Sequence, residues 1–183
     1  STYLAKFAKL MRQSLDYSEM QVISLEKEVE FLQDYLYINK KLRFQDKLEY
    51  EIIVDAEIED DMVGMPAMIV QPYVENAIEH GLRLKNDGKV MVEFLQHDDD
   101  TIKCVISDNG IGRRQAFELR AKGAYGHKHK SRGTDITEKR LSLLKSKDGA
   151  SGGVTIIDLH DPVTGEAVGT RVEILIPIQD VMH

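Results

Sequence analysis

Cysteine, proline and long apolar runs are the features that this 183-residue sequence has least of. The single cysteine, Cys104, excludes an internal disulfide, and together with only six scattered histidines it argues against a structural zinc site. The longest uncharged run, residues 62–74, contains Pro66 and Pro72 and is shorter than the ~20 apolar residues that a membrane-spanning helix needs. We therefore expect a reducing, cytoplasmic-type setting and no membrane span within the chain.

Positive charge is also scarce overall, because 24 lysines and arginines face 31 acidic residues and leave a net charge of −7. This balance argues against nucleic-acid binding, which needs a clustered cationic surface. The charge is uneven, however, since residues 113–147 contain eleven basic and three acidic residues and sum to +8. This basic segment is either a solvated surface or a local site for an anion.

The first 45 residues contain neither glycine nor proline and show helical periodicity. A first helix is predicted to carry an apolar stripe, with Lys6 and Lys9 on its opposite side. The stripe consists of Leu4, Phe7, Ala8, Met11 and Leu15. Ser24 is a suitable N-cap for a second helix, and Glu28 suits its first turns. The two helices serve either internal packing or dimerisation.

After residue 47 the apolar period changes to two, which is typical of strands. The predicted strands cover residues 48–54, 89–95, 101–107, 154–160 and 170–176. Short turns at residues 98–100 and 164–165 predict two antiparallel hairpins.

Two more helices are expected between the strands. One begins near Pro66 and ends at Gly81, and the other begins at Asp135, in a sequence similar to a capping box, and ends at Gly149. Strand pairs with interposed helices predict an α+β fold, a two-layer sandwich in which helices cover one face of a mixed, mostly antiparallel sheet.

The segment Gln-Pro-Tyr-Val-Glu-Asn-Ala-Ile-Glu-His-Gly at residues 71–81 carries the first candidate site. In a helix, Asn76 and His80 lie one turn apart on the same face. An asparagine inside a helix competes for backbone hydrogen bonds, so its presence needs a reason. Either a polar network satisfies it, or its carbonyl oxygen is a hard ligand for Mg²⁺.

The segment Asp-Asn-Gly-Ile-Gly at residues 108–112 directly follows a predicted strand and carries the second candidate site. Its glycines, Gly110 and Gly112, allow a sharp turn and the close approach of a flat ligand. The Asp108 carboxylate only accepts hydrogen bonds, so it suits an amino donor such as the exocyclic amine of adenine. By itself, this segment is also compatible with an ordinary turn.

Taken together, these segments resemble the motifs of a known family. The chain is similar to the catalytic, ATP-binding region of LytS-class sensor histidine kinases, within the superfamily of DNA gyrase, Hsp90 and MutL. Residues 35–44 resemble the stretch before the domain, residues 71–81 the N box, residues 108–112 the first glycine box, and Gly169 with Thr170 the closing Gly-Thr element.

The resemblance implies a Bergerat-type ATP-binding catalytic domain over residues 46–183. Residues 1–45 would be a helical segment, the remnant of a dimerisation hairpin and its connecting helix. No phosphoacceptor histidine motif lies in the first helix, so the chain is expected to be a fragment of a longer, membrane-anchored kinase. The parent protein would dimerise, transfer the γ-phosphoryl group of ATP to a histidine on a helix outside this fragment, and pass it to a response regulator.

The resemblance also implies a role for each matching residue. Asn76 would coordinate the Mg²⁺ that bridges the ATP phosphates. Asp108 would bind the adenine amine, supported by Thr170, and Gly110 and Gly112 would shape the pocket. His80 would either contact phosphate or serve only as a structural residue at the helix end.

The second glycine box of the family is reduced here to one glycine, Gly133, which with Thr134 would contact phosphate. Residues 113–132 would form a lid. Its stretch His-Lys-His-Lys-Ser-Arg, residues 127–132, is either a solvated loop or a cationic cover for the triphosphate. Two histidines alone are too few ligands for a metal site.

Two other functions stay open at this point. A gyrase-type or Hsp90-type ATPase is disfavoured, because Pro72 occupies the position of that family's general base and cannot act as one. A nucleotide-binding module without kinase activity is compatible with the reduced glycine box.

Overall fold

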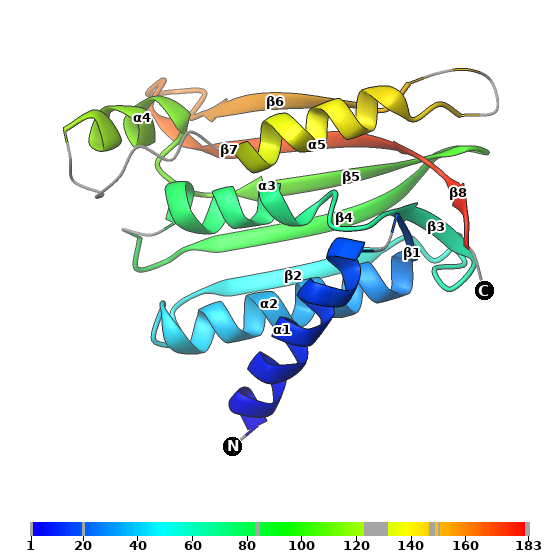
Figure 1. Cartoon of the computed structure of the whole chain (residues 1–183). Coiled ribbons are helices and arrows are strands. Elements are labelled where there is room, and N and C mark those ends of the chain that lie inside the picture. The colour runs from blue at the N-terminus through cyan, green and yellow to red at the C-terminus, as the bar shows by residue number, and fades with distance from the viewer. Residues whose placement is uncertain are drawn as a thin grey trace.

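The computed structural model describes residues 2–19, 21–82, 85–122, 132–146, 149 and 151–181. A five-stranded sheet forms one layer, and helices cover one of its faces (Figure 1). Its strands, in spatial order, are β2 (Glu49–Val54), β4 (Lys89–Asp98), β5 (Thr101–Asp108), β7 (Ala167–Pro177) and β6 (Gly153–His160). This arrangement confirms the predicted α+β class.

The sheet is mixed, because β2 pairs with β4 in parallel while the other neighbours are antiparallel. Both predicted hairpins, β4–β5 and β6–β7, are confirmed. The register places Asp108, Thr170 and Asp158 side by side across β5, β7 and β6. Successive residues of a strand face opposite sides, so these three side chains share the helix-covered face near one end of the sheet.

The helices are α1 (Thr2–Glu19), α2 (Leu25–Leu42), α3 (Gln71–Asn76), the π-helical turn η1 (Ala77–Leu82), α4 (Arg113–Ala121) and α5 (Arg132–Leu143). Ser24 caps α2 as predicted, since its Oγ accepts a hydrogen bond from the Lys27 N–H at 3.3 Å. Leu32 and Leu36 of α2 are fully buried in the same core as Phe94 of the sheet and Ile78 of η1. The second N-terminal helix is therefore part of the main core.

Two predicted helix starts are wrong. Pro66 ends a short strand, β3 (Val63–Pro66), which pairs with β1 (Val22–Ser24) and β8 (Gln179–Asp180). The helix starts five residues later, where Pro72 occupies the first turn. Asp135 lies inside the first turn of α5 and does not cap it, and α5 ends at Leu143, before Gly149.

The apolar stripe of the first helix does not face the rest of the chain. Leu10 and Tyr17 of α1 pack against α2, whereas Leu4, Phe7, Met11 and Leu15 remain exposed. The reason lies in α2, which presents acidic side chains to α1. Lys6 and Lys9 form ion pairs with Asp34 at 3.1 and 3.4 Å, and Lys9 also pairs with Glu30. Within the described ranges, no helix is long and apolar enough to cross a membrane.

Candidate functional site

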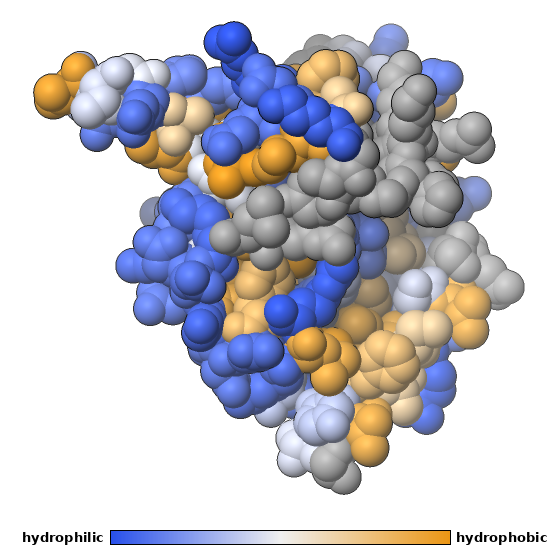
Figure 2. Space-filling model, turned by 90° about the vertical axis from the view of Figure 1, so that its left-hand side faces the viewer, coloured by the Kyte–Doolittle hydropathy of each residue, from blue (hydrophilic) through white to orange (hydrophobic). Residues whose placement is uncertain are grey.

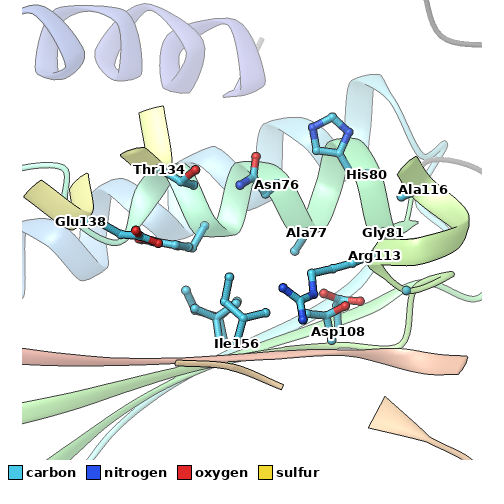
Figure 3. A pocket seen from close by; sticks show the side chains of 15 residues that line it. Asn76, Ala77, His80, Gly81, Asp108, Arg113, Ala116, Thr134, Glu138 and Ile156 are labelled. Atoms are coloured by element: carbon cyan, nitrogen blue, oxygen red, sulfur yellow. The ribbon is translucent and has the colours of Figure 1, made fainter. Parts of the chain in front are cut away.

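A pocket opens between the sheet and the helices and collects most of the predicted site residues (Figure 3). Residues of α3 and η1, β5, β6, β7, α4 and α5 line it. They are Tyr73, Asn76, Ala77, His80, Gly81, Ile106, Asp108, Gly112, Arg113, Ala116, Thr134, Glu138, Ile156, Thr170 and Val172. The β-branched side chains of the sheet form an apolar floor, and polar groups stand around it.

The helix of residues 71–82 places two of the polar groups. Pro72 lies in its first turn, and Tyr73 and Val74 anchor it in the core. At Ala77 the helix widens into a π-helical turn, a feature that is frequent at functional sites. Asn76 and His80 stay on the pocket side of this helix, both partly buried, as their spacing predicted.

Asp108 lines the pocket and is buried, with only 9% of its surface exposed. Its Oδ1 accepts a hydrogen bond from the Gly110 N–H at 2.8 Å. Burial raises the pKa of the carboxyl to about 6, while the amides of Gly110 and Thr170 and the charge of Lys85 act in the opposite direction. A buried carboxylate with unused acceptor capacity suits a ligand that brings an N–H donor.

Close backbone approach shapes the pocket beside Asp108. The Ile111 N–H donates to the Gly81 carbonyl at 3.0 Å, which joins the Asp108 turn to the end of η1. A Cβ at Gly110 would lie 2.4 Å from the Gly81 oxygen, so a side chain does not fit there. Gly112 has φ +84°, which favours glycine, and starts the turn into α4. Gly110 thus shapes the pocket from behind, while Gly112 lines it.

The α5 helix supplies the opposite rim. Thr134 and Glu138 lie one turn apart and both line the pocket. Gly133 is in the first turn of α5, next to Thr134. Of the predicted cationic stretch at residues 127–132, residues 127–131 lie outside the described residues. Among the described side chains, no group of three or more His, Cys, Asp or Glu could hold a metal ion.

An ion pair closes the side of the pocket toward β6. The Arg113 Nε and Nη2 groups donate to the two carboxylate oxygens of Asp158 at 2.8 and 2.7 Å. This bidentate contact lowers the pKa of Asp158, so the pair stays charged unless the pH falls below the ordinary carboxyl range. It ties the first turn of α4 to the edge strand of the sheet.

The sequence thus identified six residues that the structure brings together in one pocket. They are Asn76, His80, Asp108, Gly112, Thr134 and Thr170. It missed Tyr73, Arg113 and Glu138. Arg113 directly follows the first glycine box, and Tyr73 and Glu138 lie one helical turn from Asn76 and Thr134. These sequence positions are the signal that could have identified the three residues.

Comparison with known proteins agrees with this geometry. A family model for histidine kinases matches residues 1–48. The sensor protein LytS of Oceanobacillus iheyensis is 31% identical over 146 residues, which is 77% of this chain and 24% of that protein. The sensor histidine kinase YpdA of Escherichia coli is 28% identical over 106 residues, which is 57% of this chain and 18% of that protein. The chain therefore spans less than a quarter of the length of these relatives.

Solved structures give the same result for the fold. The histidine kinase domain of the Erythrobacter litoralis blue-light-activated histidine kinase has a TM-score of 0.58 at 15% identity, covering 96% of this chain and 75% of that one. The mycobacterial sensor histidine kinase MprB has a TM-score of 0.55 at 16% identity, covering 87% and 98%. The fold is that of histidine kinase catalytic domains.

Proposed function

Because the chain matches LytS-class histidine kinases in sequence and histidine kinase catalytic domains in fold, we propose that it binds ATP with Mg²⁺ and provides the γ-phosphoryl group for a histidine of the parent protein. From there the group would pass to a response regulator. The observation that carries this proposal is the pocket itself, in which a buried acceptor, Asp108, faces an apolar floor, and Asn76, His80 and Thr134 stand on the helical side.

Each side chain would serve one part of the nucleotide. Asp108 would accept the adenine amine, with Thr170 beside it in register, while Ile106 and Val172 would contact the flat base. Asn76 would offer its carbonyl oxygen to Mg²⁺, which shares its remaining positions with phosphate and water. His80, Gly133 and Thr134 would contact the phosphates. Phosphoryl transfer depends mainly on this positioning and on charge neutralisation.

The size of the pocket fits the assignment of separate side chains to the base and to the phosphates. Its enclosed volume is about 200 Å³, below the ~300–1,000 Å³ that is typical of small-molecule sites. The enclosed part therefore suits the base, and the phosphates would extend along the rim that Asn76 and Thr134 form. Arg113 also lines the pocket, where its guanidinium is paired with Asp158.

The metal role of Asn76 can be tested by calorimetry with ATP, with and without Mg²⁺. A contact to a charged partner contributes about 1.5–3 kcal/mol, so Mg²⁺ should strengthen binding to the wild-type chain by roughly 10- to 150-fold. In Asn76→Ala this gain should disappear, while metal-free affinity changes little. Asn86→Ala, an exposed asparagine outside the pocket, is the matched control. An undiminished Mg²⁺ effect in Asn76→Ala would contradict the role.

An ATPase is the second candidate, because Glu138 lines the pocket and carries a carboxylate that could activate water. Glu75, next to the metal-site asparagine, is exposed and does not line the pocket. Steady ATP hydrolysis by the chain that is lost in Glu138→Gln would favour this alternative over the kinase.

We also propose that a second copy of the chain covers the exposed stripe of α1. Leu4, Phe7, Met11 and Leu15 are 58%, 43%, 52% and 69% exposed. Figure 2 shows apolar side chains gathered at the lower right of the molecule, where this helix begins. A contiguous apolar stripe on a helix is a typical association surface. The resemblance to a dimerising kinase family supports the same partner.

A charge placed within this stripe should weaken association. In Phe7→Glu/Met11→Glu, the dimer dissociation constant should rise by roughly tenfold or more, because two apolar anchors are lost from the centre of the surface. Analytical ultracentrifugation over a concentration series measures it. Ala5→Glu adds one negative charge at an exposed position about 100° around the helix and should change little. Equal effects of the two variants would exclude the stripe as the interface.

A further inference from the structure

Glu28 of α2 is a charged residue for which the proposed function gives no role. Its side chain is completely buried, with 0% of its surface exposed. Neither carboxylate oxygen makes a hydrogen bond of ordinary geometry with any described residue. A buried carboxylate is costly unless it is paired, so its position needs a physical reason.

The surroundings of Glu28 supply one. Its carboxylate faces the turn of residues 67–70, where the backbone amides of Met68 and Val70 stabilise the charged form. This turn leads directly into α3, whose N-cap residue, Val70, has no capping side chain. Met68 has φ +59°, which is unfavourable for a residue with a side chain. A negative charge beside these amides stabilises this strained turn.

The turn also meets a second helix that lines the pocket. The Arg140 Nη1 group of α5 donates to the Ala67 carbonyl at 2.9 Å, and the Arg140 charge also acts on Glu28. The Ala67 N–H in turn donates to the Gln21 carbonyl at 3.2 Å. Glu28 thus stands where α2 meets the start of the Asn76 helix and the end of the Thr134 helix.

We propose that Glu28 is a positioning residue, whose ionised carboxylate fixes the turn of residues 67–70 and thereby the helix that carries Asn76. The proposal rests on the proposed nucleotide site for its effect on ligand binding, but not for its effect on the turn. A rigid helix transmits a shift at its first turn to a side chain six residues later. The α2 helix is thereby connected to the pocket without contacting a ligand.

The charge state of Glu28 would then matter near neutral pH. Burial raises the pKa of Glu28 to about 7, although the two amides and Arg140 act in the opposite direction. The other titratable groups that its charge affects are Cys104 of β5 and Tyr17 of α1, and the pKa of each is raised above its ordinary value. Among these groups, only Glu28 is expected to titrate between pH 6 and 8.

The test is a pH titration of the full chain by NMR, followed by calorimetry with Mg²⁺·ATP. In the wild type, the amide signals of residues 67–70 should shift with a midpoint near pH 7, and this midpoint should be absent in Glu28→Gln. At pH 8, nucleotide affinity should fall in Glu28→Gln by roughly 2- to 30-fold, the range of coupling between linked sites. Asp34→Asn is the matched control, because Asp34 is also a buried acid of α2 but pairs with Lys6 and Lys9.

Three results would overturn the proposal. These are an unchanged amide titration in Glu28→Gln, an unchanged affinity of that variant at pH 8, or an equal loss of affinity in Asp34→Asn. The wild-type titration tests the proposal even if Glu28→Gln does not fold. If the amide signals of residues 67–70 show no midpoint near pH 7 in the wild type, the proposal is overturned as well. A wild-type chain that titrates there yet fails to bind ATP would refute the proposed function and leave the positioning of the turn supported.

Discussion

Asp108→Ala is expected to weaken ATP binding by roughly 10- to 150-fold, because a hydrogen bond to a charged group contributes about 1.5–3 kcal/mol. The carboxylate is buried in the pocket, and Gly110 already holds one of its oxygens in place. Among the residues that the structure describes, no other carboxylate of the sheet lines the pocket. Calorimetry with ATP measures the loss, and Asp99→Asn, at the exposed turn on the opposite end of β5, is the control. Unchanged affinity in Asp108→Ala would exclude its role in base recognition.

The same residue predicts a pH dependence of ATP binding. The pKa of Asp108 is raised to about 6, mainly by burial. Only the ionised carboxylate is a pure acceptor, so ATP affinity should decrease as the pH falls from 7.5 to 5.5. Asp108→Asn should bind more weakly and should lose this midpoint near 6, whereas the separate midpoint near 7 that we assign to Glu28 should remain.

Stability of the free protein should change in the opposite direction. A folded-state pKa above the ordinary carboxyl value means that the folded protein binds the proton more tightly than the unfolded chain does. The Asp108 contribution to the free energy of unfolding is therefore fully present below about pH 4 and is lost as the pH rises through about 6. Denaturant unfolding at pH 5 and pH 7.5, in the wild type and in Asp108→Asn, measures this contribution.

Gly169→Ala is expected to have the largest effect on stability, a loss of about 3 kcal/mol or more. Gly169 has φ +147°, and a Cβ there would lie 1.9 Å from the backbone oxygen of Asp108. Since the obstacle is backbone, β5 and β7 would have to separate beside Asp108 and Thr170. Urea unfolding measures the free-energy change, and calorimetry should show loss of ATP binding in any folded fraction.

Gly153→Ala is the matched control for this substitution. Gly153 lies in the neighbouring strand β6, and a Cβ at this position would meet nothing within 4 Å. Its conformation does not demand glycine, so alanine should be neutral or stabilise the chain by up to ~1 kcal/mol. Similar unfolding curves for the two variants would show that close strand contact at Gly169 is not essential.

Local sequence signals predicted most of the secondary structure. The two-residue period identified all five strands of the main sheet, and Ser24 correctly located the start of α2. The three short strands β1, β3 and β8 were missed, because segments of two to four residues show no period. The error at Pro66 has a similar cause, since proline suits both a first helical turn and the end of a short strand.

The orientation of α1 illustrates the limit of periodicity. Its apolar stripe is real, but it faces away from the rest of the chain, because Asp34 and Glu30 of α2 attract the lysine side of the helix. A hydrophobic stripe identifies a surface that favours contact. It does not determine whether the contact is within the chain or with another copy.

By itself, the sequence determined the α+β class and the residues around which the pocket forms, because motif spacing and alternation are properties of the chain alone. Only the tertiary structure decided how these residues meet. The strand register aligns Asp108 with Thr170, and the approach of Gly110 to Gly81 joins this end of the sheet to the Asn76 helix. The burial of Glu28 was equally invisible in the sequence. Burial and charge pairing depend on contacts between segments far apart in the chain, and no local pattern specifies those contacts.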